Sequence, residues 1–260
     1  MKVGDITAVL EAFAPLRIQE SWDNSGLIIG SPEDEVHGVL VGFDCTRALI
    51  DEAVEKGCDM VVTHHPLIFK GVKRIDGNDP VGAAIMQAIR KGVAVYAAHT
   101  TADKVITGVS GAMARRLELT NVSIMVPEED GTIGLGCIGD FPHPMTGKEA
   151  LQYVQEKFGL KVIKSSRPLE TPITRVAILG GSGGGEIAQA MSKGAQLYIT
   201  ADIPTTTSLP RKALCSWTWD ILRVKWRLWT FSLRKSGKNS LPLQATKAAR
   251  WTGAIRSTIL

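Results

Sequence analysis

The sequence predicts an α/β fold: two related three-layer α/β domains built from a duplicated βαβ unit. The first observation is an internal repeat, because residues 38–63 align without gaps on residues 175–200, an offset of 137. The second is the pattern within each copy, which reads strand, turn, helix, strand. The third is a change of composition after Pro204, which predicts an aberrant carboxyl-terminal tail.

The first copy of the repeat shows why it is expected to fold as a βαβ unit. Its middle part, residues 49–54, carries apolar residues at helical spacing, and Gly57 stands where such a helix would end. The repeat also places Asp202 opposite His65, at equivalent strand ends. We therefore expect both copies to direct these strand ends towards one cleft, where open α/β sheets hold their ligands.

The amino-terminal segment predicts an amphipathic helix over residues 6–16, with Asp5 as its N-cap. Asp5 and Glu11 interrupt the apolar run, which excludes a signal peptide and a membrane anchor. No stretch approaches the roughly eighteen apolar residues of a membrane helix. Residues 22–24 precede an expected strand over residues 27–29, and they either line a cleft or simply build the turn.

A buried strand is predicted over residues 60–63, where an apolar run follows a Gly-Cys-Asp segment. It ends in the adjacent His64 and His65, at the edge of the sheet where α/β proteins place their sites. Since neighbouring strand residues point to opposite faces, the pair can serve two metal ions more readily than one. Taken alone, the pair also fits a core histidine next to an exposed one.

Residues 93–98 predict a second apolar strand, which ends in His99 and, four residues later, Asp103. A carboxylate beside imidazoles suits a borderline divalent ion such as zinc, manganese or iron. His99 is either a ligand or a residue that orients one. Asp44, at the end of the first strand of the repeat, either orients a ligand or caps the helix after Thr46.

Three segments carry a resemblance to a known family: residues 20–27 (Glu-Ser-Trp-Asp-Asn-Ser-Gly-Leu), residues 63–69 (Thr-His-His-Pro-Leu-Ile-Phe), and residues 98–100 (Ala-His-Thr) with Asp103. They resemble the signatures of the GTP cyclohydrolase I type 2 homologues, also called Nif-three-like dinuclear metal-centre proteins. The resemblance extends from residue 1 to about Pro204. It implies that His64, His65 and Asp103 are ligands of a site for two divalent metal ions. The family completes this site with a Gly-His-x-x-x-Glu motif, but no histidine follows His143 here.

The resemblance implies metal-dependent hydrolase chemistry, with a site that is incomplete in this chain and binds metal weakly or binds a single ion. It also implies an unknown small-molecule substrate, a nucleotide by the family name only, and a homo-oligomer, a hexamer in the family. One alternative is a non-enzymatic, metal-dependent scaffold or regulatory protein, and another is a non-functional frameshift product. The four cysteines show no Cys-x-x-Cys spacing, and we expect free thiols in a cytoplasmic protein without a membrane partner.

The charge of the chain changes sign at Pro204. Residues 1–204 hold 19 basic and 25 acidic residues, whereas residues 205–260 hold 11 basic residues and the single acid Asp220. Five of the six tryptophans also lie in this last part. Three readings fit such a change: a basic arm for nucleic acid, a segment for a membrane surface, or a tail that selection never shaped.

The genetic code favours the third reading. If the gene has lost one nucleotide after the codon for Pro204, restoring it forces some residues, because tryptophan has a single codon. The segment Trp217-Thr218-Trp219-Asp220 then becomes Asp, next Leu, Met or Val, next Gly, next His or Tyr. With permitted codons, the restored frame contains the missing Gly-His-x-x-x-Glu motif. We therefore expect a frameshift after Pro204.

The expected organisation is a first α/β domain over residues 1–120, an incomplete second domain over residues 121–204, and an out-of-frame tail over residues 205–260. Within the second domain, a helix is expected over residues 147–158. The glycine-rich segment 180–185 misses the P-loop pattern. It is either a phosphate cradle or, as we prefer, a tight turn that needs positive φ angles.

Overall fold

The computed structural model describes the backbone of residues 1–128, 131–167, 169–204, 214–217 and 243–245, and the side chains of those up to residue 204. The chain divides into two compact units. The first comprises residues 1–7, 27–97 and 239–260, and the second comprises residues 8–26 and 98–238. A division at residue 120, expected from the sequence, stays a prediction.

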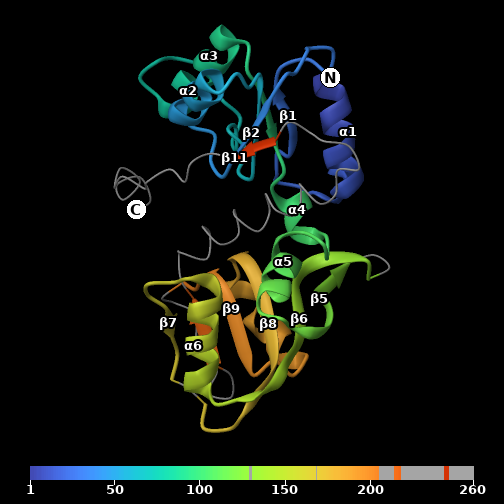
Figure 1. The fold of residues 1–260 in the computed structure, drawn as a ribbon, viewed down its shortest axis with the longest axis vertical. Coiled ribbons are helices and arrows are strands. Elements are labelled where there is room, and N and C mark those ends of the chain that lie inside the picture. Colours follow the sequence, from blue (N-terminus) through green and yellow to red (C-terminus); the bar gives the residue numbers. More distant parts are fainter. Residues whose placement is uncertain (129–130, 168, 205–213, 218–242, 246–260) are drawn as a thin grey trace. The chain divides into compact units, whose positions relative to one another are not determined.

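The first unit is built on a five-stranded sheet in the order β1-β4-β3-β2-β11. Strands β1, β2 and β11 of this sheet are labelled in Figure 1. Strands β11, β2, β3 and β4 run parallel to one another. The strands are β1 (Gly26–Ile29), β2 (Val39–Gly42), β3 (Met60–Thr63), β4 (Ala94–Ala97) and β11 (Leu243–Ala245), and the helices are α2 (Arg47–Glu55), α3 (Pro80–Lys91) and the start of α1 (Val3–Phe13).

Local signals fix the ends of the two helices that cover this sheet. Helix α2 begins after Thr46, whose side chain accepts a hydrogen bond from the Leu49 N–H group, and Gly57 follows it with a φ of 65°. This confirms the helix end expected at Gly57. Helix α3 has Asp79 as N-cap and ends at Gly92, also with a φ of 65°.

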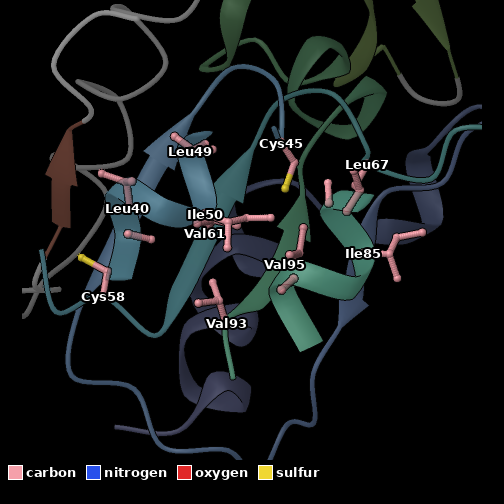
Figure 2. Packing of buried hydrophobic residues seen from close by; sticks show 13 residues of the cluster. Leu40, Cys45, Leu49, Ile50, Cys58, Val61, Leu67, Ile85, Val93 and Val95 are labelled. Carbon is pink, nitrogen blue, oxygen red and sulfur yellow. The ribbon is translucent and has the colours of Figure 1, made fainter. Parts of the chain in front are cut away.

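A hydrophobic core lies between the sheet and these two helices (Figure 2). Alternate residues of three strands, Leu40, Val61 and Val95, face the apolar sides of α2 and α3. Each fully buried Leu, Ile or Val side chain stabilises the fold by about 1.5–3 kcal/mol. The residues between them, such as Val41 and Val62, are buried as well, so that both faces of the sheet are covered.

The second unit contains a six-stranded sheet in the order β5-β6-β8-β9-β10-β7. Its strands are β5 (Thr120–Glu128), β6 (Ile133–Met145), β7 (Lys164–Ser165), β8 (Ile173–Ser182), β9 (Leu197–Asp202) and β10 (Leu214–Trp217). Its helical elements are η1 (Leu16–Ile18), α4 (Thr100–Lys104), α5 (Val109–Arg116), α6 (Gly147–Phe158), η2 (Gly184–Glu186) and α7 (Ile187–Ser192).

Helices cover both faces of this second sheet, which gives the expected three layers. On one face, Ile138 and Ala177 pack in a core cluster with Ile187 of α7. On the other, the Cys137 thiol lies 3.2 Å from the backbone oxygen of Ser110 in α5. The helix expected over residues 147–158 is confirmed as α6, which begins at a complete capping box with Thr146 as N-cap.

The duplicated βαβ unit is confirmed down to the register of its strands. In the first copy Val39 pairs with Met60, and in the second Val176 pairs with Leu197. Each residue of the second pair lies 137 positions after its counterpart, which is the offset of the sequence repeat. Both pairs of strands are parallel and are joined through a helix, as a βαβ unit requires.

The glycine-rich segment 180–185 is a tight connection, but the expected reason for its glycines is wrong. None of these glycines has a positive φ. Close packing demands glycine at position 183, because a Cβ atom there would lie 2.3 Å from the hydroxyl oxygen of Tyr198. The Tyr198 and Thr200 hydroxyls donate hydrogen bonds to the backbone oxygens of Gly183 and Gly181.

Two other expectations need comment. Helix α1 begins at Val3, earlier than expected, and Asp5 lies in its first turn, where its carboxylate accepts a hydrogen bond from the Lys2 N–H group. Asp5 is therefore not the N-cap. The strands β10 and β11 belong to the tail after Pro204, while Trp219, Trp226, Trp229 and Trp251 lie outside the described residues.

Candidate metal centre

His64 and His65 lie directly after strand β3 in the first unit, and the backbone holds both of them. Their N–H groups donate to the same acceptor, the backbone oxygen of Phe43, at 3.1 and 3.0 Å. The buried hydroxyl of Thr63 donates to the backbone oxygen of His65 at 2.9 Å. The chain therefore leaves the sheet in one defined conformation at the point where the two imidazoles stand.

The two imidazoles have different surroundings. His64 is only 2% exposed, and its ring stacks on the ring of Phe43 with a centroid distance of 5.5 Å. The His65 ring meets Phe43 edge-on at 4.4 Å and is partly exposed. The centroids of the two imidazoles are 5.0 Å apart. One imidazole is thus part of the core and the other stands at its surface.

Asp44 interacts with the more exposed of these imidazoles. Its Oδ1 atom lies 2.7 Å from Nδ1 of His65. Thr46, and not Asp44, is the N-cap of helix α2. The role of Asp44 in orienting a metal ligand stays a prediction. A carboxylate that accepts from Nδ1 leaves Nε2 of His65 as the ring nitrogen able to bind a metal ion.

His99 and Asp103 belong to the second unit, at the start and within the short helix α4. Nδ1 of His99 lies 2.8 Å from Oδ1 of Asp23, whose side chain is fully buried. Burial alone raises the pKa of the Asp23 carboxyl. Hydrogen bonds from His99, Thr100 and Ser25, with the charge of a protonated His99, outweigh burial and hold this pKa well below its usual range.

A nearly buried cation follows Asp103 in α4. The Lys104 side chain is 5% exposed, and its Nζ atom lies 2.7 Å from Glu20 and 3.0 Å from Glu128. Burial lowers the pKa of Lys104, but its hydrogen bonds with the two carboxylates raise it more, so that its pKa lies above the ordinary value. Lys104 therefore ties α4 to the segment before β1 and to strand β5.

The donor set fits a borderline divalent metal ion. His64, His65 and His99 are imidazoles that could supply ligands to such an ion. Two of them, His65 and His99, engage Nδ1 with a carboxylate, as histidine ligands of metals usually do. His64 and His65 belong to the first unit, and His99 and Asp103 belong to the second.

The sequence left the role of Asp23 open between lining a cleft and building a turn. In the structure its carboxylate reaches His99, which stands 76 positions later in the chain. The available signal was the motif at residues 20–27, which contains Asp23. Asp202, which the repeat aligns with His65, ends strand β9 and pairs there with Ser182 of β8.

Comparisons with known proteins identify the family of the chain. The model of the Duf34/NIF3 family (NGG1p interacting factor 3) matches residues 1–213. A Clostridium acetobutylicum protein called GTP cyclohydrolase 1 type 2 homolog is 33% identical over 204 residues, which are 78% of this chain and 76% of that protein. A protein of the same name from Streptomyces coelicolor is 32% identical over 207 residues, 78% of this chain and 73% of that protein.

Solved structures share the fold. A crystal structure of a hypothetical protein of Staphylococcus aureus superposes with a TM-score of 0.85 at 26% identity, covering 95% of this chain and 96% of the other. A Bacillus cereus protein related to NIF3 gives 0.86 at 21% identity, covering 94% and 96%. Among the helices of the described residues, none is long and apolar enough to cross a membrane.

Proposed function

The chain belongs to the Duf34/NIF3 family, and from this membership we propose that it binds two divalent metal ions and performs metal-dependent hydrolysis. The observation that carries the proposal is the pair His64-His65 at the end of β3, with His65 oriented by Asp44. We propose His64, His65 and Asp103 as the ligands, with zinc, manganese or iron as the ion.

Strand register supports the convergence of these residues. Thr63 of β3 pairs with Ala97 of β4 within the first unit. His64 follows Thr63 directly, and His99 follows Ala97 after one residue, so both leave the sheet from neighbouring strand ends. Ligand atoms of one site need to come within about 2–2.5 Å of a shared ion.

When bound, two ions lower the pKa of a coordinated water and polarise the group to be hydrolysed. The part of the protein is to hold the imidazoles in place and to keep their binding nitrogens free of protons. Thiol chemistry is a poor alternative, because burial raises the pKa of Cys45 and Cys137 to about 12. Relatives bear the name GTP cyclohydrolase 1 type 2 homolog, and a nucleotide is accordingly the first substrate class to assay.

We also propose that residues 205–260 are an out-of-frame tail. Support comes from the charge change at Pro204, from the residues that the single codon of tryptophan forces, and from the end of the family match at residue 213. The restored frame would supply the His and Glu of the missing motif. In the chain as given, we propose that the site is incomplete and holds metal weakly, as a single ion or less per chain.

Metal analysis of ligand variants tests the proposal. The frame-restored protein is loaded with zinc and dialysed, and metal per chain is compared between the parent, His65→Gln and Asp103→Asn. His37→Gln is the matched control, since His37 also pairs with an aspartate but is 77% exposed. We expect each ligand variant to lose bound zinc and the control to keep it. Equal zinc content in all four proteins would refute the ligand assignment.

Turnover separates enzyme from scaffold. The metal-loaded, frame-restored protein is incubated with nucleotides and simple phosphate esters, and hydrolysis products are measured. Hydrolysis that disappears in Asp103→Asn supports the enzyme. Two bound ions without any turnover would favour a metal-dependent scaffold or regulatory protein, in which case the oligomeric state measured by light scattering becomes the first property to explore.

A further inference from the structure

A cavity of about 300 Å³ lies beside the first residues of helices α2 and α3, entirely within the first unit. Its lining comes from the segments that follow strands β2 and β3 and from the start of α3: Cys45, Thr46, Arg47, Ala48, Leu67, Pro80 and Val81. Strands β2 and β3 are parallel, so the segments after them meet at one edge of the sheet. This is the edge at which open α/β sheets bind their ligands.

Most of the lining is apolar. Cys45 and Leu67 are its most buried members, at 8% and 7% exposed, and Figure 2 shows them at the same end of the core cluster. Burial, together with the charge of Asp44, raises the pKa of Cys45 to about 12, so its thiol is neutral near pH 7. An apolar cavity of about 150 Å³ takes up one benzene molecule. A cavity of about 300 Å³ therefore has room for two fused rings.

Arg47 is the single charged residue of the lining. It is exposed, and no hydrogen bond or ion pair engages its guanidinium among the side chains that the structure describes. It occupies the first position of α2, whose first turn contains no acidic residue. The positive end of the helix dipole disfavours a cation there. Helix stability does not explain Arg47, whereas a negative group of a ligand in the cavity would pair with it.

Two carboxylates flank the cavity in sequence, but both are engaged elsewhere. Asp44 lies 2.7 Å from Nδ1 of His65. Asp79, the N-cap of α3, accepts a hydrogen bond from the Gly82 N–H group at 2.7 Å. Neither belongs to the lining. The charge within the cavity wall is therefore that of Arg47 alone, and it selects for a ligand with a negative group.

We propose that this cavity binds a small organic anion with an aromatic ring, with the ring between Cys45 and Leu67 and the negative group at Arg47. The chain joins the cavity to the proposed metal site, since Cys45 directly follows the aspartate that contacts His65. The bound anion is accordingly the aromatic part of the substrate, and only this last assignment rests on the proposed function.

Methyl NMR spectra of the full chain, kept free of metal by a chelator, test the binding itself. The ligand used is 2-naphthoate, which joins two fused rings to one carboxylate. We expect saturable shifts of the Leu67 and Val81 methyl signals, at about millimolar concentrations or below. Uncharged 2-naphthamide should bind about tenfold more weakly, and acetate, which has no ring, should leave these signals unchanged. Unshifted signals with 2-naphthoate, or equal affinity for the two naphthalene compounds, would overturn the proposal.

Arg47→Gln tests the pairing with the negative group. It should weaken the binding of 2-naphthoate about tenfold and leave that of 2-naphthamide unchanged. Arg47→Lys keeps the charge and should retain more affinity than Arg47→Gln. Arg90→Gln is the matched control, because Arg90 is an exposed arginine in the last turn of α3. The same 2-naphthoate affinity in Arg47→Gln and Arg90→Gln would show that Arg47 is merely a solvated surface residue.

Ala48→Leu tests the cavity by filling it. Ala48 is exposed on α2 and leucine is a good helix former, so the fold should be kept. We expect the affinity for 2-naphthoate to fall by about tenfold or more. Ala12→Leu is the control, since Ala12 is an exposed alanine of helix α1. Parental affinity in Ala48→Leu would place the ligand somewhere other than this cavity.

Zinc content, measured in a separate experiment, distinguishes this inference from the proposed function. Binding of 2-naphthoate with the expected methyl shifts, by a chain that holds no zinc even after frame restoration, would support the cavity and defeat the metal site. Zinc held by a chain that binds no 2-naphthoate would keep the metal site and overturn the inference on the cavity.

Discussion

Nζ of Lys104 lies 2.7 Å from Oε1 of Glu20, and this contact links helix α4 to the segment that carries Asp23. Glu128 of β5 completes the cluster at 3.0 Å. The Lys104 ammonium is almost enclosed, whereas both carboxylates keep part of their surface in water. The lysine is therefore the member of the cluster that depends most on its partners.

Replacing Lys104 by methionine should destabilise the protein by about 1–3 kcal/mol, because two partly buried carboxylates then face each other without a cation. Urea unfolding of the full chain measures this difference. Lys2→Met is the control, since Lys2 forms an exposed ion pair with Glu33, and exposed pairs contribute about 0–1 kcal/mol. Equal losses in the two variants would contradict a special role for Lys104.

Gly183→Ala should also destabilise the protein. A Cβ atom there would lie 2.6 Å from a methyl carbon of Leu179 and 2.7 Å from the hydroxyl oxygen of Thr200. Forcing a methyl group into such a packed place costs about 1–3 kcal/mol. Gly185→Ala is the matched control two residues away, because a Cβ there meets nothing within 4 Å. The unfolding midpoints should fall for Gly183→Ala only, and no difference between the two variants would contradict the packing argument.

The capping box of α6 should respond to acid. The Thr146 N–H group and hydroxyl hold the pKa of the exposed Glu149 carboxyl below its ordinary value of 4.5. A lowered pKa means that the contribution to stability is present above pH 4.5 and is lost as the pH falls through the lowered value. Carboxyl ¹³C titration should show this pKa in the parent and a higher one in Thr146→Ala. An unchanged Glu149 pKa in that variant would mean that the side chain of Thr146 plays no part.

Restoring the reading frame after Pro204 should raise metal content. The chain as given should keep less than one zinc ion after dialysis, and the restored chain should approach two, because the returned His and Glu add ligands that three protein groups cannot replace. Metal analysis on both proteins measures this. Two tightly held ions in the unrestored protein would show that residues 205–260 are compatible with a complete site.

The sequence predicted those features of the fold that depend on local pattern. The βαβ repeat was visible in the sequence as an offset of 137 residues. The strand registers keep this offset, because Val39 pairs with Met60 and Val176 pairs with Leu197. Helix α6, expected over residues 147–158, is bounded by local residues, because Thr146 caps its start and Gly159, a residue with positive φ, follows its end. Both signals lie within a few residues of the element that they define.

The surroundings of the histidines could not be obtained in this way. The bond from His99 to Asp23 joins residues 76 positions apart, and no periodicity connects them. The sequence did not show that Thr46, and not Asp44, caps helix α2. In the structure the Thr46 side chain accepts a hydrogen bond from the Leu49 N–H group. The glycine-rich segment was correctly predicted as a tight connection. Only its neighbours Tyr198 and Thr200 show that lack of space, and not a positive φ, demands glycine at position 183.

Strand β10 lies between β9 and β7 in the second sheet, and this position has a consequence for aggregation in the cell. Its residues pair with β9 in parallel register, Leu214 beside Leu197 and Trp217 beside Thr200. Main-chain hydrogen bonds do not depend on the identity of the side chains, so many different sequences can fill this place in the sheet. A product that stopped at Pro204 would leave the buried strand β9 with an open edge, and open edges recruit other chains into aggregates.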